Sequence, residues 1–193
     1  MKNWNEIGEK IRTISILETF KKHLTLEKQK VISDKELQVR QVHSVYSELL
    51  RKTPWSKISA DEESLLIVTY ILFATEGILG FRMNIIIYSL MLKGHHDVWF
   101  EQKQKFVSSF DELFEVHLST RLKFLKRHGF QFFSEICPRD IRNAIAHMSF
   151  NIESNGTFHM KKGKKYTKKE LAIKMTDIVK IVNMIDEALE QGA

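Results

Sequence analysis

The sequence predicts an all-α protein, an antiparallel helical bundle with a small β-hairpin insert between a short helix and the C-terminal helix. Two observations predict this class. The chain of 193 residues has only 2 Pro and 8 Gly, and its apolar residues, 43% of the total, recur mostly at helical spacing. One short stretch near residue 150 instead alternates apolar and polar side chains around a turn. A chain of this length can bury a core of its own.

Residues 1–58 are expected to form accessory helices beside a main bundle of residues 59–193. Helical spacing predicts a first helix over about 3–29, through Trp4, Ile7, Ile11, Ile14, Leu17 and Leu24. Ser33–Glu36 has the Ser-x-x-Glu pattern of a capping box and is expected to open a second helix. Thr53–Pro54 ends that helix.

A long apolar helix is expected from a second capping box, Ser59–Glu62, to about Leu92. Its apolar part has the length of a membrane span, but Glu76 and Arg82 interrupt it, and charged groups are costly inside a bilayer. We therefore expect the central helix of a soluble bundle and no membrane contact.

A fourth helix is predicted over about 97–128, because apolar residues recur there at helical spacing and Gly129 follows as a helix-ending residue. Residues 130–135 are expected to form a connection. Pro138 is acceptable in a first helical turn, so a short helix is expected to begin near it.

The pattern then changes to that of a β-hairpin. Residues 149–152 and 157–160 alternate, and Asn155-Gly156 between them is a strong hairpin turn. A third capping box, Thr167–Glu170, is expected to open the last helix, which continues to about Leu189.

Charge and cysteine content narrow the function classes. The formal net charge of +6 is compatible with a nucleic-acid partner. The single cysteine, Cys137, excludes an intramolecular disulfide and a cysteine-based zinc site.

His95-His96-Asp97 lacks further ligands at a recognisable spacing, so no metal site is predicted. The charged N-terminus has no signal-peptide core, and a cytoplasmic location is expected.

The candidate catalytic residues lie in Arg142-Asn143-Ala144-Ile145-Ala146-His147. The guanidinium of Arg142 matches phosphate oxygens. His147 is of the residue type that transfers protons near neutral pH, with an unperturbed pKa of about 6.5. Asn143 can orient either of them. The alternative is that His147 is only a hydrogen-bonded histidine at a helix end.

This string resembles the R-N-x-x-x-H signature of HEPN domains, small helical domains of which many are metal-independent ribonucleases. Over about residues 59–190 the order of elements is also similar: a long apolar helix, a second long helix, the motif, a hairpin and a closing helix. The resemblance implies RNA cleavage without a cofactor, leaving 2′,3′-cyclic phosphate ends, in a toxin–antitoxin, phage-defence or stress setting. The alternatives are a non-catalytic domain that binds nucleotide or RNA, and an interaction scaffold held by an antitoxin or other regulatory protein.

Helix geometry raises one difficulty, because five positions on an ideal helix correspond to about 140° of rotation and separate the side chains of Arg142 and His147. Two solutions are open. The helix ends after Ala146 and frees His147, or the site is composite across a two-fold dimer. The resemblance implies the second, since catalytic HEPN proteins dimerise with their motifs facing each other.

Further residues are candidates to support the site. Two basic clusters could bind a nucleic-acid backbone, or could simply be solvated surface. One lies around the hairpin end and contains Lys161, Lys162, Lys164, Lys165, Lys168 and Lys169; the other precedes the motif and contains Arg121, Lys123, Lys126, Arg127 and His128. Glu76 could pair with Arg142 or position His147; the alternatives are a structural pair with Arg82 or simple exposure.

Overall fold

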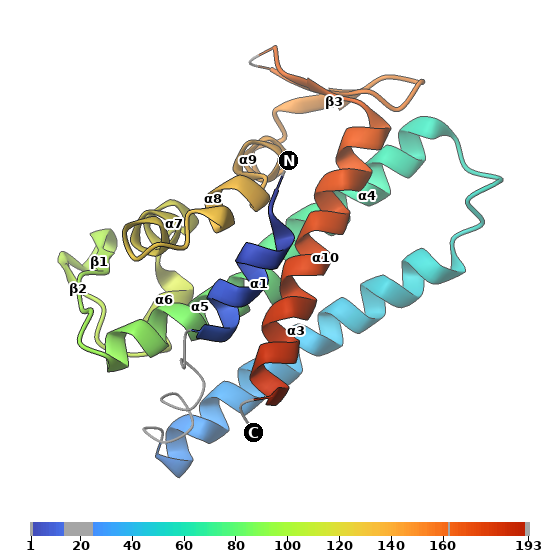
Figure 1. Ribbon diagram of the computed structural model, residues 1–193. Helices are drawn as coiled ribbons and strands as arrows, with labels where there is room; N and C mark the ends of the chain where they lie inside the picture. Colours follow the sequence, from blue (N-terminus) through green and yellow to red (C-terminus); the bar gives the residue numbers. More distant parts are fainter. Residues whose placement is uncertain (1, 14–24, 162, 192–193) are drawn as a thin grey trace. The chain divides into compact units, whose positions relative to one another are not determined.

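The computed structural model describes residues 2–13, 25–161 and 163–191. The described chain is mostly helical with small antiparallel sheets (Figure 1), which confirms the predicted class at that level. The chain divides into two compact units. Residues 37–79 and 136–180 form one, called the motif unit here because it holds Arg142 and His147, and the other described residues form the second unit.

The motif unit is built on helix α4 (Ala60–Glu76), against which the short helix α9 (Arg139–Ala146) packs. It also contains α3 (Leu26–Lys52) from Leu37 onward and α10 (Lys168–Gln191) as far as Lys180. The Ser59–Glu62 capping box is confirmed, with the Ser59 backbone N–H donating to Glu62 Oε2 at 2.8 Å. The buried apolar side chains of this unit include Val68, Ile71, Ile141, Phe158, Leu171 and Ile178.

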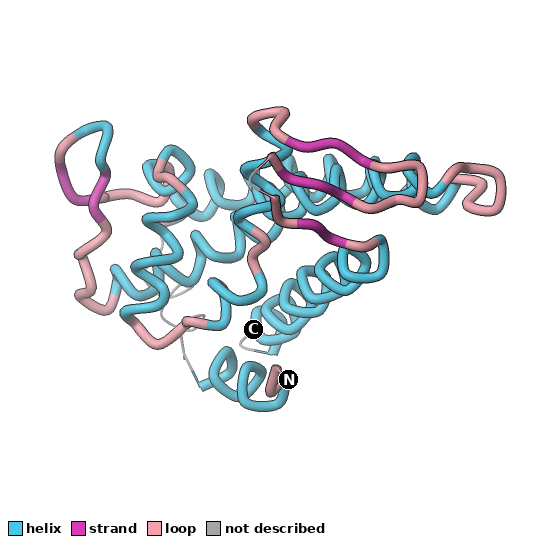
Figure 2. Tube along the Cα trace, turned by 90° about the horizontal axis from the view of Figure 1, so that it is seen from above, coloured by secondary structure: helices cyan, strands magenta, loops and turns pink. Residues whose placement is uncertain are grey.

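The predicted hairpin is confirmed and has a third strand. Strands β3 (Phe150–Ile152), β4 (Phe158–Met160) and β5 (Lys165–Tyr166) lie side by side in one antiparallel sheet (Figure 2). At the β3–β4 turn, Gly156 has a φ of +83°, and a Cβ there would lie 2.7 Å from the Ala60 carbonyl oxygen. Only glycine fits this close approach to the start of α4.

The second unit contains α1 (Trp4–Thr13), α5 (Ile78–Leu92) from Gly80 onward, and the ends of α3 and α10. Next along the chain, strands β1 (Trp99–Phe100) and β2 (Lys105–Phe106) form a hairpin that is joined by the 3₁₀ turn η1 (Glu101–Lys103). Three short helices follow, α6 (Glu112–Glu115), α7 (Leu118–Arg127) and α8 (Phe132–Ile136). Its buried apolar side chains include Phe81, Met83, Phe100, Leu113, Phe124 and Phe133.

The predictions for the N-terminal helices are corrected in part. Residues 14–24, with Ile14, Leu17 and Leu24, lie outside the described residues, so the first predicted helix is tested only by α1. The prediction that a helix opens at Ser33 is wrong, because α3 begins at Leu26 and runs through this position. Ile32 is buried one residue earlier, and continuing the helix through exposed Ser33 costs only a few tenths of a kcal/mol.

The long apolar helix predicted over 59–92 is divided at Gly77 into α4 and α5. Gly77 leaves the helical region, with φ −82° and ψ −97°, while its N–H still donates to the Phe73 carbonyl oxygen at 2.8 Å. A Cβ at this position would lie 2.7 Å from that same oxygen. Residues 60–92 are long and apolar enough to cross a membrane, but 61% of their most apolar 18-residue window is buried within the protein.

The prediction of one helix over 97–128 is wrong. Val98 and Phe100 are both fully buried and alternate in the manner of a strand, whereas Phe106, expected on the helix face, is 55% exposed. Gln104 adopts a left-handed conformation with a φ of +50°, which no continuous α-helix accepts. The connection predicted over 130–135 is likewise mostly helical, as α8.

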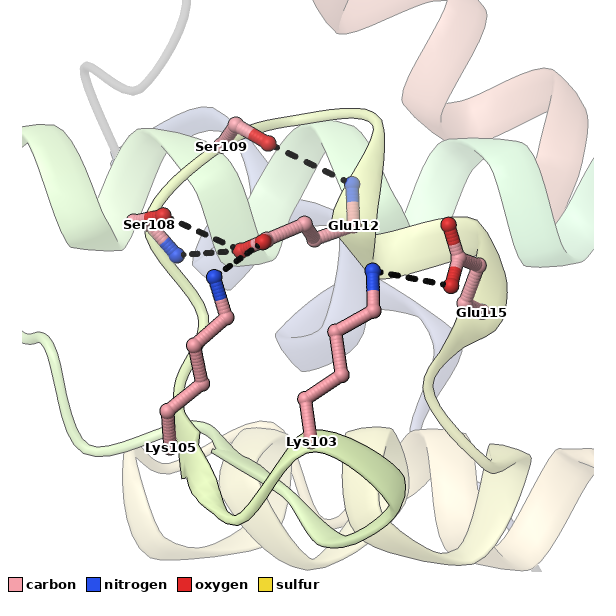
Figure 3. Close-up of polar contacts among 6 residues, drawn as sticks. All are labelled: Lys103, Lys105, Ser108, Ser109, Glu112 and Glu115. Carbon is pink, nitrogen blue, oxygen red and sulfur yellow. Dashed lines mark hydrogen bonds and ion pairs between the residues drawn. The ribbon is translucent and has the colours of Figure 1, made fainter.

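A polar cluster stabilises the chain between β2 and α6 (Figure 3). The Glu112 carboxylate accepts hydrogen bonds from Lys105 Nζ at 2.5 Å and from the Ser108 backbone N–H at 2.8 Å. The hydrogen bond from Lys105, with those from Ser108, lowers the pKa of Glu112 to about 2. Beside it, Lys103 Nζ lies 3.1 Å from Glu115 Oε2 in a more exposed ion pair.

We predict that Glu112→Gln lowers the melting temperature at pH 7 by a few degrees, since ~1 kcal/mol corresponds to about 2–4 °C in a protein of this size. A carboxyl whose folded-state pKa is depressed stabilises the fold above its unfolded-state pKa, and this contribution is lost as the pH falls. The difference between wild type and variant should therefore shrink between pH 4.5 and about 2. Thermal unfolding at several pH values measures it. Glu115→Gln is the control, because exposed pairs contribute little, and a pH-independent difference for Glu112→Gln would contradict the assignment.

Candidate active site

Helix α9 presents the motif because its apolar side chains face inward. Ile141 and Ala144 are buried, while Asn143 and His147 are exposed. This spacing fixes the rotation of α9 on α4 and leaves the polar side chains of the motif at the surface. The predicted short helix near Pro138 is thus confirmed, with Pro138 immediately before its first residue.

Arg142 is held by two neighbours. Its Nε donates to Glu76 Oε1 at the end of α4, and its Nη1 donates to Asn143 Oδ1 at 3.0 Å. The Arg142 side chain remains 29% exposed. Glu76 therefore pairs with Arg142, which is one of the four interpretations that the sequence left open. The alternative pairing with Arg82 is wrong, because Arg82 is buried in the second unit against Glu36 and Asp186.

His147 is the residue at which α9 ends. It follows the last helical residue, Ala146, and its own N–H donates to the Asn143 carbonyl oxygen at 3.1 Å. Met148 comes next with a left-handed φ of +48° and turns the chain toward β3. Within the described part of the chain, the His147 imidazole makes no hydrogen bond or ion pair. The helix end expected after Ala146 is therefore present, and it leaves the imidazole exposed to solvent.

A second polar group ties the hairpin to the first turn of α9. Asp140 Oδ2 accepts from Tyr166 Oη at 2.6 Å and from Lys164 Nζ. Burial raises the pKa of Asp140, but the hydrogen bonds from Lys164 and Tyr166 outweigh it, and the net pKa lies below the ordinary value. The pKa of Lys164 is raised, chiefly by its bond to Asp140. Sequence reasoning missed this function of Asp140, since neither its spacing nor its type marks a partner in the hairpin.

The lysines predicted to bind nucleic acid have different environments. Lys165 is exposed on β5 and Lys161 is exposed directly after β4, whereas Lys164 is bound to Asp140 and Lys168 pairs with Glu63 at 2.7 Å. Lys162 lies outside the described residues. Lys161, Lys164, Lys165 and Lys169 are thus exposed on the motif unit, and among them Lys164 is bound to Asp140.

The second basic cluster belongs to the second unit. Lys123, Lys126 and Arg127 line a groove of about 400 Å³ together with Trp99. Arg127 also pairs with Asp97 at 3.0 Å. Arg121 is not available to a ligand, because it is buried and donates to Asn84 Oδ1 at 3.0 Å.

The described residues offer no group of three or more His, Cys, Asp or Glu side chains arranged to hold a metal ion. Comparisons of the chain with protein-family models, with curated proteins and with solved structures found no match.

Proposed function

We propose that this protein is a metal-independent endoribonuclease of HEPN type. The observation that carries the proposal is the arrangement of Arg142 and His147 on helix α9. Arg142 is fixed in orientation by Glu76 and Asn143, and an exposed His147 terminates the same short helix. An oriented cation and an exposed imidazole are two of the groups that phosphodiester cleavage by the neighbouring 2′-hydroxyl requires.

The reaction follows from these groups. A neutral His147 takes the proton of the 2′-hydroxyl as its oxygen attacks the phosphorus. A protonated histidine donates a proton to the 5′-oxygen as the P–O5′ bond breaks. Arg142 stabilises the negative charge that develops on the phosphorane. The products are a 2′,3′-cyclic phosphate and a 5′-hydroxyl, and no cofactor takes part.

We further propose that the protein acts as a homodimer with a composite site, so that the histidines of two subunits supply the base and the acid. Exposed apolar side chains of the motif unit support an association. Val45 is 72% exposed and Leu49 50% exposed on α3, and Leu65 is 48% exposed on α4. Apolar surface of this kind is commonly covered by a partner. Three further parts of the proposal depend on the resemblance alone. They are an antitoxin or other regulatory protein as a partner, a cytoplasmic location, and a role in defence or stress.

The second candidate function is a non-catalytic domain that binds nucleotide or RNA or serves as a scaffold. The observation that favours it is the Glu76–Arg142 ion pair, which neutralises the cation that catalysis needs. Expression in a host cell separates the two candidates. A free ribonuclease toxin arrests growth, and His147→Ala relieves the arrest, whereas a scaffold is harmless in both forms.

Two exposed lysines, Lys165 on β5 and Lys161 directly after β4, are expected to bind the RNA backbone. The double variant Lys161→Gln/Lys165→Gln should weaken RNA binding to a similar extent for all sequences. Its plot of log affinity against log salt should be shallower by about 0.7 per lysine for single strands. Binding titrations from 50 to 300 mM salt measure this. Lys57→Gln, an exposed lysine in the loop before α4, is the control for charge, and an unchanged salt dependence in the double variant would contradict the assignment.

A further inference from the structure

A cavity of about 200 Å³ lies between α3 and α4 in the motif unit. One side is aromatic and is formed by His43 and Tyr46 of α3 and by Tyr70 and Phe73 of α4. The polar side chains of Gln38 and Glu76 also line it. Five of its eleven lining residues come from α3.

The aromatic side chains form one connected wall. The ring centroids of Tyr46 and Phe73 are 5.4 Å apart, and those of Tyr46 and Tyr70 are 5.8 Å apart. The hydroxyl group of Tyr46 donates to the Leu66 carbonyl oxygen, and that of Tyr70 lies 3.1 Å from His43 Nε2. These bonds fix the orientation of the rings. Phe73 is nevertheless 46% exposed, so one aromatic face of the wall is available to a flat ligand.

Glu76 joins this cavity to the candidate active site. The same carboxylate that lines the cavity accepts the hydrogen bond from Arg142 Nε. A nucleotide whose phosphate is bound by Arg142 would therefore have its base within reach of the aromatic wall. A carboxylate has acceptor positions for more than one donor, so Glu76 can also accept from a base amino group.

We infer that this cavity binds the nucleobase beside the scissile phosphate, with preference for bases that carry an amino group. The inference rests on the proposed ribonuclease function for the position of the phosphate. Single-stranded RNA is recognised by stacking unpaired bases on aromatic side chains and by hydrogen bonds to their edges. Guanine, adenine and cytosine offer an exocyclic amino donor to Glu76 or Gln38, whereas uracil offers only its ring N3–H.

The first test is the cleavage pattern. Wild type and Phe73→Ala are incubated with an RNA of mixed sequence, and the cut sites are read by sequencing. We expect wild type to prefer amino-bearing bases at one position beside the cut, and Phe73→Ala to lose that preference. Ile173→Ala is the matched control, because Ile173 lies on α10 of the same unit with a similar exposure of 51% but does not line the cavity.

The second test is direct binding of the four nucleoside 5′-monophosphates, which does not depend on cleavage. Uridine monophosphate should bind most weakly, and Phe73→Ala should weaken binding of the other three by about tenfold. Cleavage with a pattern that Phe73→Ala leaves unchanged would overturn the inference and leave the ribonuclease function intact. Binding that Phe73→Ala weakens, without any cleavage, would overturn the ribonuclease function and support the cavity as a nucleotide site.

Discussion

Replacing His147 by alanine is expected to lower the rate of RNA cleavage by about 10²–10⁴-fold, the usual contribution of a general acid–base group. The protein should remain folded. The His147 side chain is exposed and makes no hydrogen bond or ion pair among the described residues, so truncating it leaves no buried group unpaired. Single-turnover cleavage and a circular dichroism melt of the same preparation measure the two properties.

The control for this variant is His159→Ala, a second histidine of the motif unit, which lies on β4 and pairs with Glu153 at 2.8 Å. It should retain cleavage activity close to that of wild type. Full activity in His147→Ala would remove the proposed base and acid from the mechanism. The activity would then have to come from another site or from a contaminating nuclease.

Arg142→Ala is expected to lower cleavage by about 10²–10³-fold, as the loss of a group that stabilises transition-state charge does in other enzymes. Arg142→Lys should recover only part of the rate, because an ammonium group keeps the charge and loses the planar fork. Rate measurements at saturating RNA separate this loss from weaker binding.

The matched control is Arg139→Ala, which removes an exposed arginine from the same helix one turn earlier. It should change the rate by much less than Arg142→Ala. Equal losses in the two variants would indicate that α9 contributes only a general positive charge, and the specific function of Arg142 would be wrong.

Much of the motif unit could be predicted from local sequence patterns. The capping box at Ser59–Glu62, the Asn155-Gly156 turn and the start of α9 after Pro138 each depend on residues within a few positions of one another. Such local interactions carry the same geometry wherever they occur. The β1–β2 region could not be predicted in this way, since its apolar residues fit a helical period as well as an alternating one.

The contacts that define the site are long-range. Glu76 and Arg142 are 66 residues apart, and nothing in the sequence around either one specifies the other. The same holds for Asp140 with Tyr166 and for the aromatic wall shared by α3 and α4. Each depends on how α9, the sheet and α3 pack on α4, which a pattern in one segment does not determine.

The most direct test of the central claim is cleavage, in excess EDTA, of a short RNA containing one preferred site, compared with the same RNA carrying a single 2′-deoxy nucleotide before the scissile phosphate. The proposed mechanism predicts that only the all-ribose strand is cut, leaving a 2′,3′-cyclic phosphate and a 5′-hydroxyl detectable by mass spectrometry. Cleavage of the 2′-deoxy strand, or activity that EDTA abolishes, would contradict it.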